Sequence, residues 1–123
     1  MNEFDTNIPI YLQIMNSIKQ QIVAGQLKPG DKLASVREQA ETFAVNPNTV
    51  QRAYQELERE GVSETRRGTG SFIAENNDLI PELRTQMAQE VIRRFIEGMR
   101  ALGFSDAQIV EEMIAPALKK GIV

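Results

Sequence analysis

The sequence predicts a mainly α-helical chain with one small β-hairpin, divided into two units. Two helix-start signals follow each other closely, at Ser35 and at Asn46. A glycine-containing turn over residues 66–70 then lies between two short segments of strand-forming residues. After a polar segment, residues 75–78, a long apolar stripe at helical spacing begins. These observations predict a compact unit over residues 1–75 and a helical hairpin over residues 76–123.

Composition excludes several classes of function. The 123 residues include no cysteine and no histidine, so thiol chemistry, disulfides and the commonest zinc ligands are excluded, together with the usual general base near neutral pH. We expect no metal and no cofactor. No apolar run approaches the roughly 20 residues needed to span a bilayer, and the acidic start, Met1 to Asn7, lacks the core of a signal peptide. A cytoplasmic protein without a membrane segment is expected.

The first expected helix begins at Pro9 and ends at Gly25. Its apolar residues recur every three or four positions and form one wall of the core: Tyr11, Ile14, Ile18 and Ile22. A turn at residues 27–31 follows, and residues 32–33 are predicted to form a short edge strand.

Two further helices are predicted across a very short turn. Ser35 and Glu38 have the spacing of a capping box, which indicates a helix start near Val36. Asn46 followed by Pro47 is a second start, with Asn as cap and Pro at the first helical position.

The second of these helices has two chemically distinct faces. At 100° per residue, one face is apolar and the other carries amide and guanidinium groups: Asn48, Gln51, Arg52, Gln55 and Arg59. No acidic residue occurs from Thr42 through Gln55, although the net charge of the chain is −3. Such a face suits insertion into the major groove of DNA, where these side chains reach base edges. An ordinary solvated helix face is the alternative for this helix alone.

The hairpin that follows favours the DNA-binding interpretation. Residues 62–65 and 71–74 are predicted strands, and the turn between them holds Arg66 and Arg67 beside Gly68, Thr69 and Gly70. Glycines allow the backbone to approach a phosphate, and the arginines supply positive charge. Helix, turn, helix and basic wing in this order predict a winged helix-turn-helix domain.

Residues 8–74 also resemble a known family. The segments IPIYLQI, LKPGDKLASVRE, AVNPNTVQRAYQELEREGV and ETRRGTGSFI are similar to the DNA-binding domain of GntR-type bacterial transcription regulators, and the short remainder resembles the YtrA-like branch. Three positions depart from the family pattern: Ala34 replaces a usual Pro, Ala44 a common Gly, and Ser63 a branched apolar residue.

The resemblance implies a regulator, expected to be a repressor, that binds double-stranded operator DNA. Positions that are often basic in the family hold Pro47 and Gln51, so a different base preference is expected. The predicted DNA-binding residues are Ser35, Arg37, Asn46, Asn48, Thr49, Gln51, Arg52, Arg66, Arg67, Gly68, Thr69 and Gly70.

The C-terminal hairpin has more apolar surface than two helices bury. Gly103 interrupts its long stripe, and Ser105 with Gln108 forms a capping box for the last helix, which Pro116 is expected to kink or end. The excess surface requires the first domain or a second copy of the hairpin. We therefore predict a homodimer that uses Leu83, Met87, Val91, Ile92, Phe95, Ile96, Met99, Leu102, Ile109, Met113 and Ile114.

Three alternatives use other features of the chain. A winged helix that binds protein would carry apolar residues on the outward face of residues 48–59, and that face has none. An enzyme would need a nucleophile and base, or a phosphate loop, and the sequence contains no such set. The Met and Phe residues of the hairpin could instead line a ligand pocket, but such stripes are usually core. The sequence does not indicate whether a small-molecule effector binds, or which one.

Overall fold

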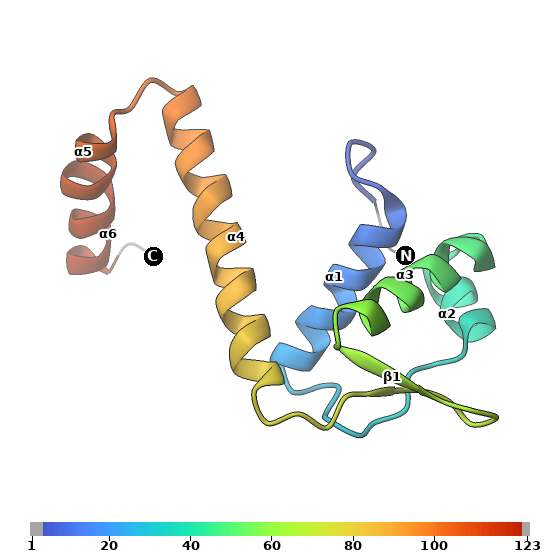
Figure 1. The fold of residues 1–123 in the computed structure, drawn as a ribbon. Helices are drawn as coiled ribbons and strands as arrows, with labels where there is room; N and C mark the ends of the chain where they lie inside the picture. Colours follow the sequence, from blue (N-terminus) through green and yellow to red (C-terminus); the bar gives the residue numbers. More distant parts are fainter. Residues whose placement is uncertain (1–3, 122–123) are drawn as a thin grey trace. The chain divides into compact units, whose positions relative to one another are not determined.

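The computed structural model describes residues 4–121, so positions 1–3 of the predicted acidic start lie outside the described residues. Its elements are α1 (Ile10–Val23), α2 (Val36–Phe43), α3 (Pro47–Arg59), β1 (Ser63–Arg66), β2 (Gly70–Ile73), α4 (Leu79–Ala101), α5 (Asp106–Gln108), the π-helical segment η1 (Ile109–Ile114) and α6 (Ala115–Lys120) (Figure 1). This order confirms the predicted fold class, three helices and a hairpin followed by C-terminal helices. The chain divides into two compact units after Leu83.

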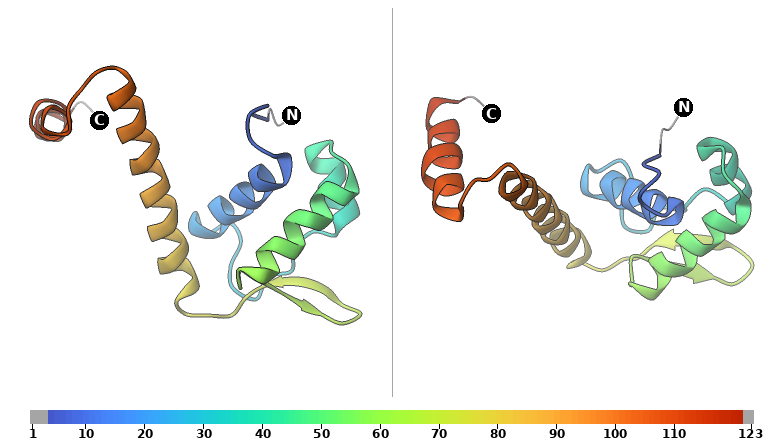
Figure 2. Two further views of the ribbon diagram at one scale, coloured as in Figure 1. Left: turned by 45° about the horizontal axis from the view of Figure 1, so that its top comes forward. Right: turned by 90° about the horizontal axis from the view of Figure 1, so that it is seen from above.

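The core of the first unit lies between α1 and α3, which are side by side in all views (Figures 1 and 2). From α1, Ile14, Ile18 and Ile22 are completely buried, and Val50 and Leu57 of α3 are equally inaccessible. Burying one such side chain stabilises a fold by about 1.5 to 3 kcal/mol relative to exposure. The predicted helical spacing of both elements is confirmed by this burial.

Both predicted helix starts of the helix-turn-helix are confirmed. Ser35 Oγ accepts a hydrogen bond from the Glu38 backbone N–H at 3.1 Å, and the Glu38 carboxylate accepts one from the Ser35 N–H at 3.0 Å. These hydrogen bonds from Ser35 hold the pKa of Glu38 below its ordinary value. Asn46 caps α3 through a 2.8 Å bond from the Asn48 N–H to its side-chain oxygen.

The wing is an antiparallel hairpin, as predicted. Its first strand begins and ends one residue later than predicted, and its second strand begins and ends one residue earlier. Ser63 pairs with Ile73 and Arg66 with Gly70, and Gly68 at φ +75° occupies the turn. Lys32 forms a bridge with Phe72, and Leu33 N–H donates to Ser71 O at 2.8 Å. The predicted edge segment at residues 32–33 therefore lies against β2 and ties the wing to the loop before α2.

The second helical region begins at Leu79, but its first turn belongs to the first unit. Leu79 and Leu83 are buried with the core of that unit, which explains why the units divide after Leu83. The predicted boundary after residue 75 lies in the polar segment between β2 and α4, before the division after Leu83.

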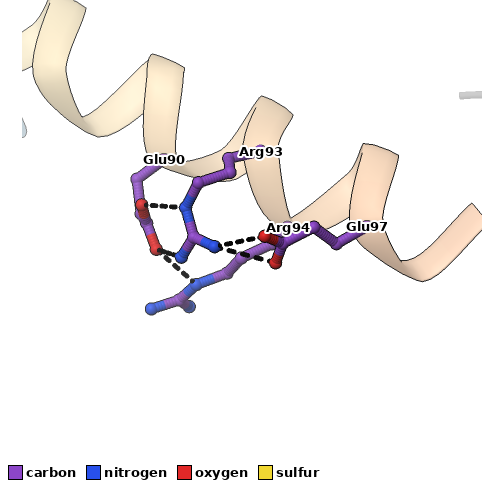
Figure 3. Close-up of polar contacts among 4 residues, drawn as sticks. All are labelled: Glu90, Arg93, Arg94 and Glu97. Atoms are coloured by element: carbon purple, nitrogen blue, oxygen red, sulfur yellow. Dashed lines mark hydrogen bonds and ion pairs between the residues drawn. The ribbon is translucent and has the colours of Figure 1, made fainter. Parts of the chain in front are cut away.

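An ion-pair network lies on the exposed surface of α4 in the second unit (Figure 3). Arg93 hydrogen-bonds to Glu90 and Glu97, and Arg94 also reaches Glu90. The bond from Arg93 lowers the pKa of Glu90 to about 2. Pairs at these three- and four-residue spacings support a helix modestly, and solvent screens them at this exposed surface.

Pro116 does not end the last helix, so that alternative of the sequence prediction is wrong. The segment remains helical from Asp106 to Lys120, with a π-helical stretch before α6. Pro116 is the second residue of α6, immediately after the π-helical stretch, where the regular α-helical hydrogen bonding is already interrupted. The capping box of Ser105 and Gln108 is confirmed at the start of the segment.

A left-handed residue forms the turn of the helix-turn-helix. Ala44, which caps the C-terminus of α2, has φ 56° and ψ 48° and is the one described non-glycine residue with positive φ. This conformation costs an L-residue with a Cβ roughly 1 to 2 kcal/mol. The strained position coincides with the place where the GntR-type pattern commonly has glycine.

Ala44→Gly is expected to stabilise the protein by roughly 1 kcal/mol, because glycine removes the strain of the left-handed conformation. The larger conformational entropy of glycine in the unfolded chain offsets only part of this gain. Urea unfolding at neutral pH measures the difference. Ala24→Gly is the matched control, because Ala24 is also an exposed helix cap but has φ −77°. The control should be neutral or destabilising. Equal effects of the two changes would contradict the assigned strain.

Candidate nucleic-acid interface

The outward face of α3 is polar and accessible, as the helical spacing predicts. Asn48, Gln51, Arg52 and Gln55 are exposed and Thr49 is half-buried, while the opposite face is buried in the core. No large apolar side chain of α3 is exposed. The surface therefore offers hydrogen-bond donors and acceptors, which suits base edges and phosphates and not an apolar protein partner.

Tyr54 connects α3 to the start of α2. Its hydroxyl donates a 2.6 Å hydrogen bond to the carbonyl oxygen of Ala34, the residue before the Ser35 cap. Burial raises the pKa of Tyr54 to about 12, so this donor stays protonated at neutral pH. The bond fixes the first turn of α2, and with it Arg37, relative to α3. Helical spacing predicts only that Tyr54 lies in the core, because spacing does not reveal the partner of a hydroxyl.

The arginines of the first unit fall into two groups. Arg59 pairs with Glu56, and Arg66 lies 3.6 Å from the Glu64 carboxylate. Arg37, Arg52 and Arg67 have no ion-pair partner among residues 4–121 and are exposed. These three guanidinium groups are thus available to an external anion, and all three belong to the predicted DNA-binding set.

The wing places its two arginines differently. Arg66 lies over the ring of Phe72, 4.1 Å from the ring centroid, whereas Arg67 is exposed in the turn. Thr69 is also exposed at the turn, and Gly70 has φ 128° beside the Lys32 side chain. The Thr65 N–H donates to the Glu58 carboxylate at 2.9 Å. Glu58 therefore links the wing to α3, a role that sequence analysis missed.

Two residues of the predicted DNA-binding set have a structural role. The side chains of Ser35 and Asn46 are both engaged in helix caps. Their contribution to DNA binding stays a prediction, but their contribution to the helix starts is defined.

Arg52 is held by a residue outside the helix-turn-helix. Its guanidinium carbon lies 4.0 Å from the centroid of the Tyr11 ring on α1. The apolar stripe of α1 predicts that Tyr11 lies in the core, and its ring does pack partly against the core. The spacing of Tyr11 on α1 gives no signal of this contact, which arises only when α1 and α3 pack together.

The predicted dimerisation residues are not equally accessible. Leu83 and Ile109 are buried within one chain, at 2% and 3% exposure, so neither belongs to the accessible apolar surface. Val91, Ile92, Phe95 and Leu102 are 41% to 74% exposed, and Ile114 is 37% exposed. Met87, Ile96, Met99 and Met113 are half-buried. Val110 and Leu118 add exposed apolar area.

The fold and this surface define the class of protein: a winged helix-turn-helix whose second motif helix and wing carry polar and basic groups. The family described as bacterial regulatory proteins, gntR family, matches residues 10–73. The chain belongs to the GntR family and is a DNA-binding transcription regulator, not an enzyme. It is 47% identical over 110 residues to the uncharacterized HTH-type transcriptional regulator YhcF of Bacillus subtilis (strain 168), covering 89% of this chain and 91% of that protein.

The YtrA-like resemblance is confirmed by a second relative. The HTH-type transcriptional repressor YtrA of Bacillus subtilis (strain 168) is 47% identical over 92 residues, which cover 74% of this chain and 71% of YtrA.

Solved structures agree with this assignment. A GntR family transcriptional regulator from Listeria monocytogenes superposes with a TM-score of 0.77 at 43% identity, covering 87% of this chain and 94% of that one. The AraR DNA-binding domain in complex with operator ORR3 gives a TM-score of 0.53 at 28% identity, covering 60% of this chain and 87% of that one.

None of the helices in the described part of the chain is long and apolar enough to cross a membrane. The same residues contain no cluster of three or more carboxylates that could hold a metal ion.

Tyr54→Phe is expected to destabilise the protein by about 1 kcal/mol, because it removes the hydrogen bond to the Ala34 carbonyl in a partly buried place. Tyr11→Phe is the matched control, since the Tyr11 hydroxyl has no hydrogen-bond partner among the described residues. Urea unfolding of the two variants gives the comparison. A loss that is the same for both tyrosines would show that the Tyr54 bond contributes nothing specific.

Proposed function

We propose that the protein is a homodimeric repressor that binds an inverted-repeat operator. The observation that carries the proposal is the coincidence of a polar α3 face with Arg37, Arg52 and Arg67, the arginines of the first unit that have no ion-pair partner among residues 4–121. Guanidinium groups without a carboxylate partner need not give up an ion pair when they meet DNA. The relative YtrA is named a repressor, which supports the direction of regulation.

The groups that would read sequence lie at the leading end of α3. Asn48 and Gln51 are exposed amides, which have the donor and acceptor geometry for adenine. Thr49 and the cap residue Asn46 adjoin them in the first turn, and Arg37 at the start of α2 supplies a guanidinium for a base or a phosphate.

The wing would contribute mainly contacts to the sugar-phosphate backbone. Arg67 is the wing arginine that has no ion-pair partner in the described part of the chain, and Gly68, Thr69 and Gly70 form a turn with little side-chain bulk. Arg66 is partly neutralised by Glu64 and stacked on Phe72, so Arg67 is the stronger candidate for phosphate.

The dimer is supported by apolar surface that one chain leaves uncovered. On α4, Val91 is 66% exposed, and Ile92 and Phe95 are exposed as well; Leu102, in the turn just after α4, is 74% exposed. Large exposed apolar areas of this kind mark interaction surfaces. A second copy of the same helix has a matching stripe, and a two-fold dimer would present two α3 faces in opposite senses. An inverted repeat is the DNA symmetry that such a dimer binds.

Phe95→Glu is expected to convert the dimer to monomer, because it puts an unpaired carboxylate into the apolar contact at a cost of several kcal/mol. Phe95 is 41% exposed in one chain, so the monomer should still fold. Gln86→Glu adds the same charge at an exposed polar position of α4 and should leave the dimer intact. Sedimentation at micromolar concentration measures both. A monomeric wild type would contradict the proposed dimer.

Arg37→Ala and Arg67→Ala are expected to weaken DNA binding in different ways. If Arg37 reads a base, its loss lowers specific affinity by about 1 to 3 kcal/mol per half-site and random DNA much less. Loss of Arg67 should weaken both DNAs alike and reduce the salt slope by about 0.9 per phosphate contact. Titrations of a selected operator and a random duplex at three salt concentrations measure these effects.

Arg84→Ala is the control for charge alone, because Arg84 is exposed in the second unit. It should change neither affinity by much. Identical losses for Arg37→Ala and Arg84→Ala on both DNAs would contradict the assigned interface.

A further inference from the structure

A groove lies between the first turns of α1 and α3, beside the outward face of α3. It is open, has a volume of about 360 Å³, and is lined by Ile10, Tyr11, Asn48, Thr49 and Arg52. Two of these residues come from α1, which is outside the helix-turn-helix motif. The groove thus extends the candidate interface beyond the residues that sequence analysis identified.

The chemistry of the groove suits an anion. Its lining contains a guanidinium, an amide and two hydroxyl groups, and no carboxylate. Arg52 has no ion-pair partner within the described chain, and the side chains of Tyr11, Asn48 and Thr49 make no hydrogen bond to another described residue. Several donors therefore face this space without an internal acceptor.

The position of Arg52 within the groove is set by Tyr11. The guanidinium lies over the aromatic ring with its carbon 4.0 Å from the ring centroid, a cation–π contact. The contact uses the positive charge of the guanidinium, and no N–H group of the Arg52 side chain donates to another described residue, so these groups are free to donate. The contact also draws Arg52 toward α1 and away from Gln51 and Gln55, which lie on the opposite side of the α3 face by helical spacing.

We propose that Tyr11 and Arg52 form a clamp for one phosphodiester group of the DNA backbone, with Arg52 bonding the phosphate and Tyr11 acting as its positioning residue. This inference rests on the proposed DNA binding and adds to it a contact from α1. The planar fork of an arginine matches two phosphate oxygens, and a guanidinium already held by an aromatic ring loses less freedom on binding. Asn48 and Thr49 line the same groove from the first turn of α3.

The contact is expected to add affinity without sequence preference. A phosphate carries no information about the base, so Arg52→Ala should weaken a selected operator and a random duplex by the same factor. It should also reduce the slope of log affinity against log salt by about 0.9 for each half-site. A larger loss on the operator than on random DNA would show that Arg52 reads a base and would overturn the proposal.

Tyr11 is tested by a conservative and a disruptive change. Tyr11→Phe keeps the ring and with it the contact to Arg52, so it should retain the part of the affinity that Tyr11→Leu loses. Tyr11→Leu keeps apolar packing but removes the ring, so it should reproduce part of the loss seen for Arg52→Ala on both DNAs. In the Arg52→Ala background, Tyr11→Leu should have no further effect. Independent, additive losses would show that Tyr11 only packs against the core.

The stacking itself is measured by the NMR shifts of the Arg52 methylene protons, which the ring current of Tyr11 moves upfield in the free protein. This measurement on the wild type tests the positioning role even if Tyr11→Leu does not fold, and ordinary shifts for these protons would overturn it. Failure of the proposed function has a different signature: the wild type would bind neither the selected operator nor random DNA. A wild type that binds, with an Arg52→Ala variant that loses nothing, refutes the clamp alone.

Discussion

The packing of α3 against α1 is the constraint on which the rest of the first unit depends. Val50, Ala53 and Leu57 are fully buried against Ile14, Ile18 and Ile22. Successive residues of a helix differ by 100°, so a rotation of α3 by one residue would bring Gln51 or Arg52 toward this core. Burying either without partners costs several kcal/mol. The apolar face therefore fixes the direction in which Asn48, Gln51 and Arg52 point.

Polar contacts attach the other DNA-facing elements to the same helix. Tyr54 bonds the chain at Ala34, just before α2, and Glu58 accepts the backbone N–H of Thr65 in β1. The segment before α2 in turn pairs with β2 through Lys32 and Leu33. The start of α2 and the wing are consequently held by separate bonds to one rigid helix. A surface that must match the spacing of DNA benefits from this preorganisation.

The second unit is stabilised differently. The pairs of Arg93 with Glu90 and Glu97 support α4 along its own length, so the helix does not depend on burial for all of its stability. Its apolar residues Val91, Ile92 and Phe95 are not buried within the chain and remain accessible. A helix that is stable with an exposed apolar stripe is suited to bind another helix.

The sequence by itself determined the elements and their chemistry, because the signals are local. Capping boxes at Ser35 and Ser105, the Asn46-Pro47 start and the three- and four-residue apolar spacing each act within a few residues. These local signals predicted the helices and the hairpin of the first unit and the exposure of the polar α3 face.

Contacts between distant residues were decided only by the tertiary structure. Tyr11 meets Arg52, and Tyr54 meets Ala34, across separations that no periodic pattern encodes. Leu83 shows the same limit: its place in the α4 stripe is visible in the sequence, but whether that position packs on the first core or faces a partner depends on where α4 leaves the core. Likewise, Pro116 has the chemistry of a helix breaker, and only its placement in the first turn of α6 after a π-helical stretch decides that the helix continues. Sequence specifies which groups are present and their local conformation; packing selects their neighbours, because a side chain's partner depends on how whole helices and strands are brought together.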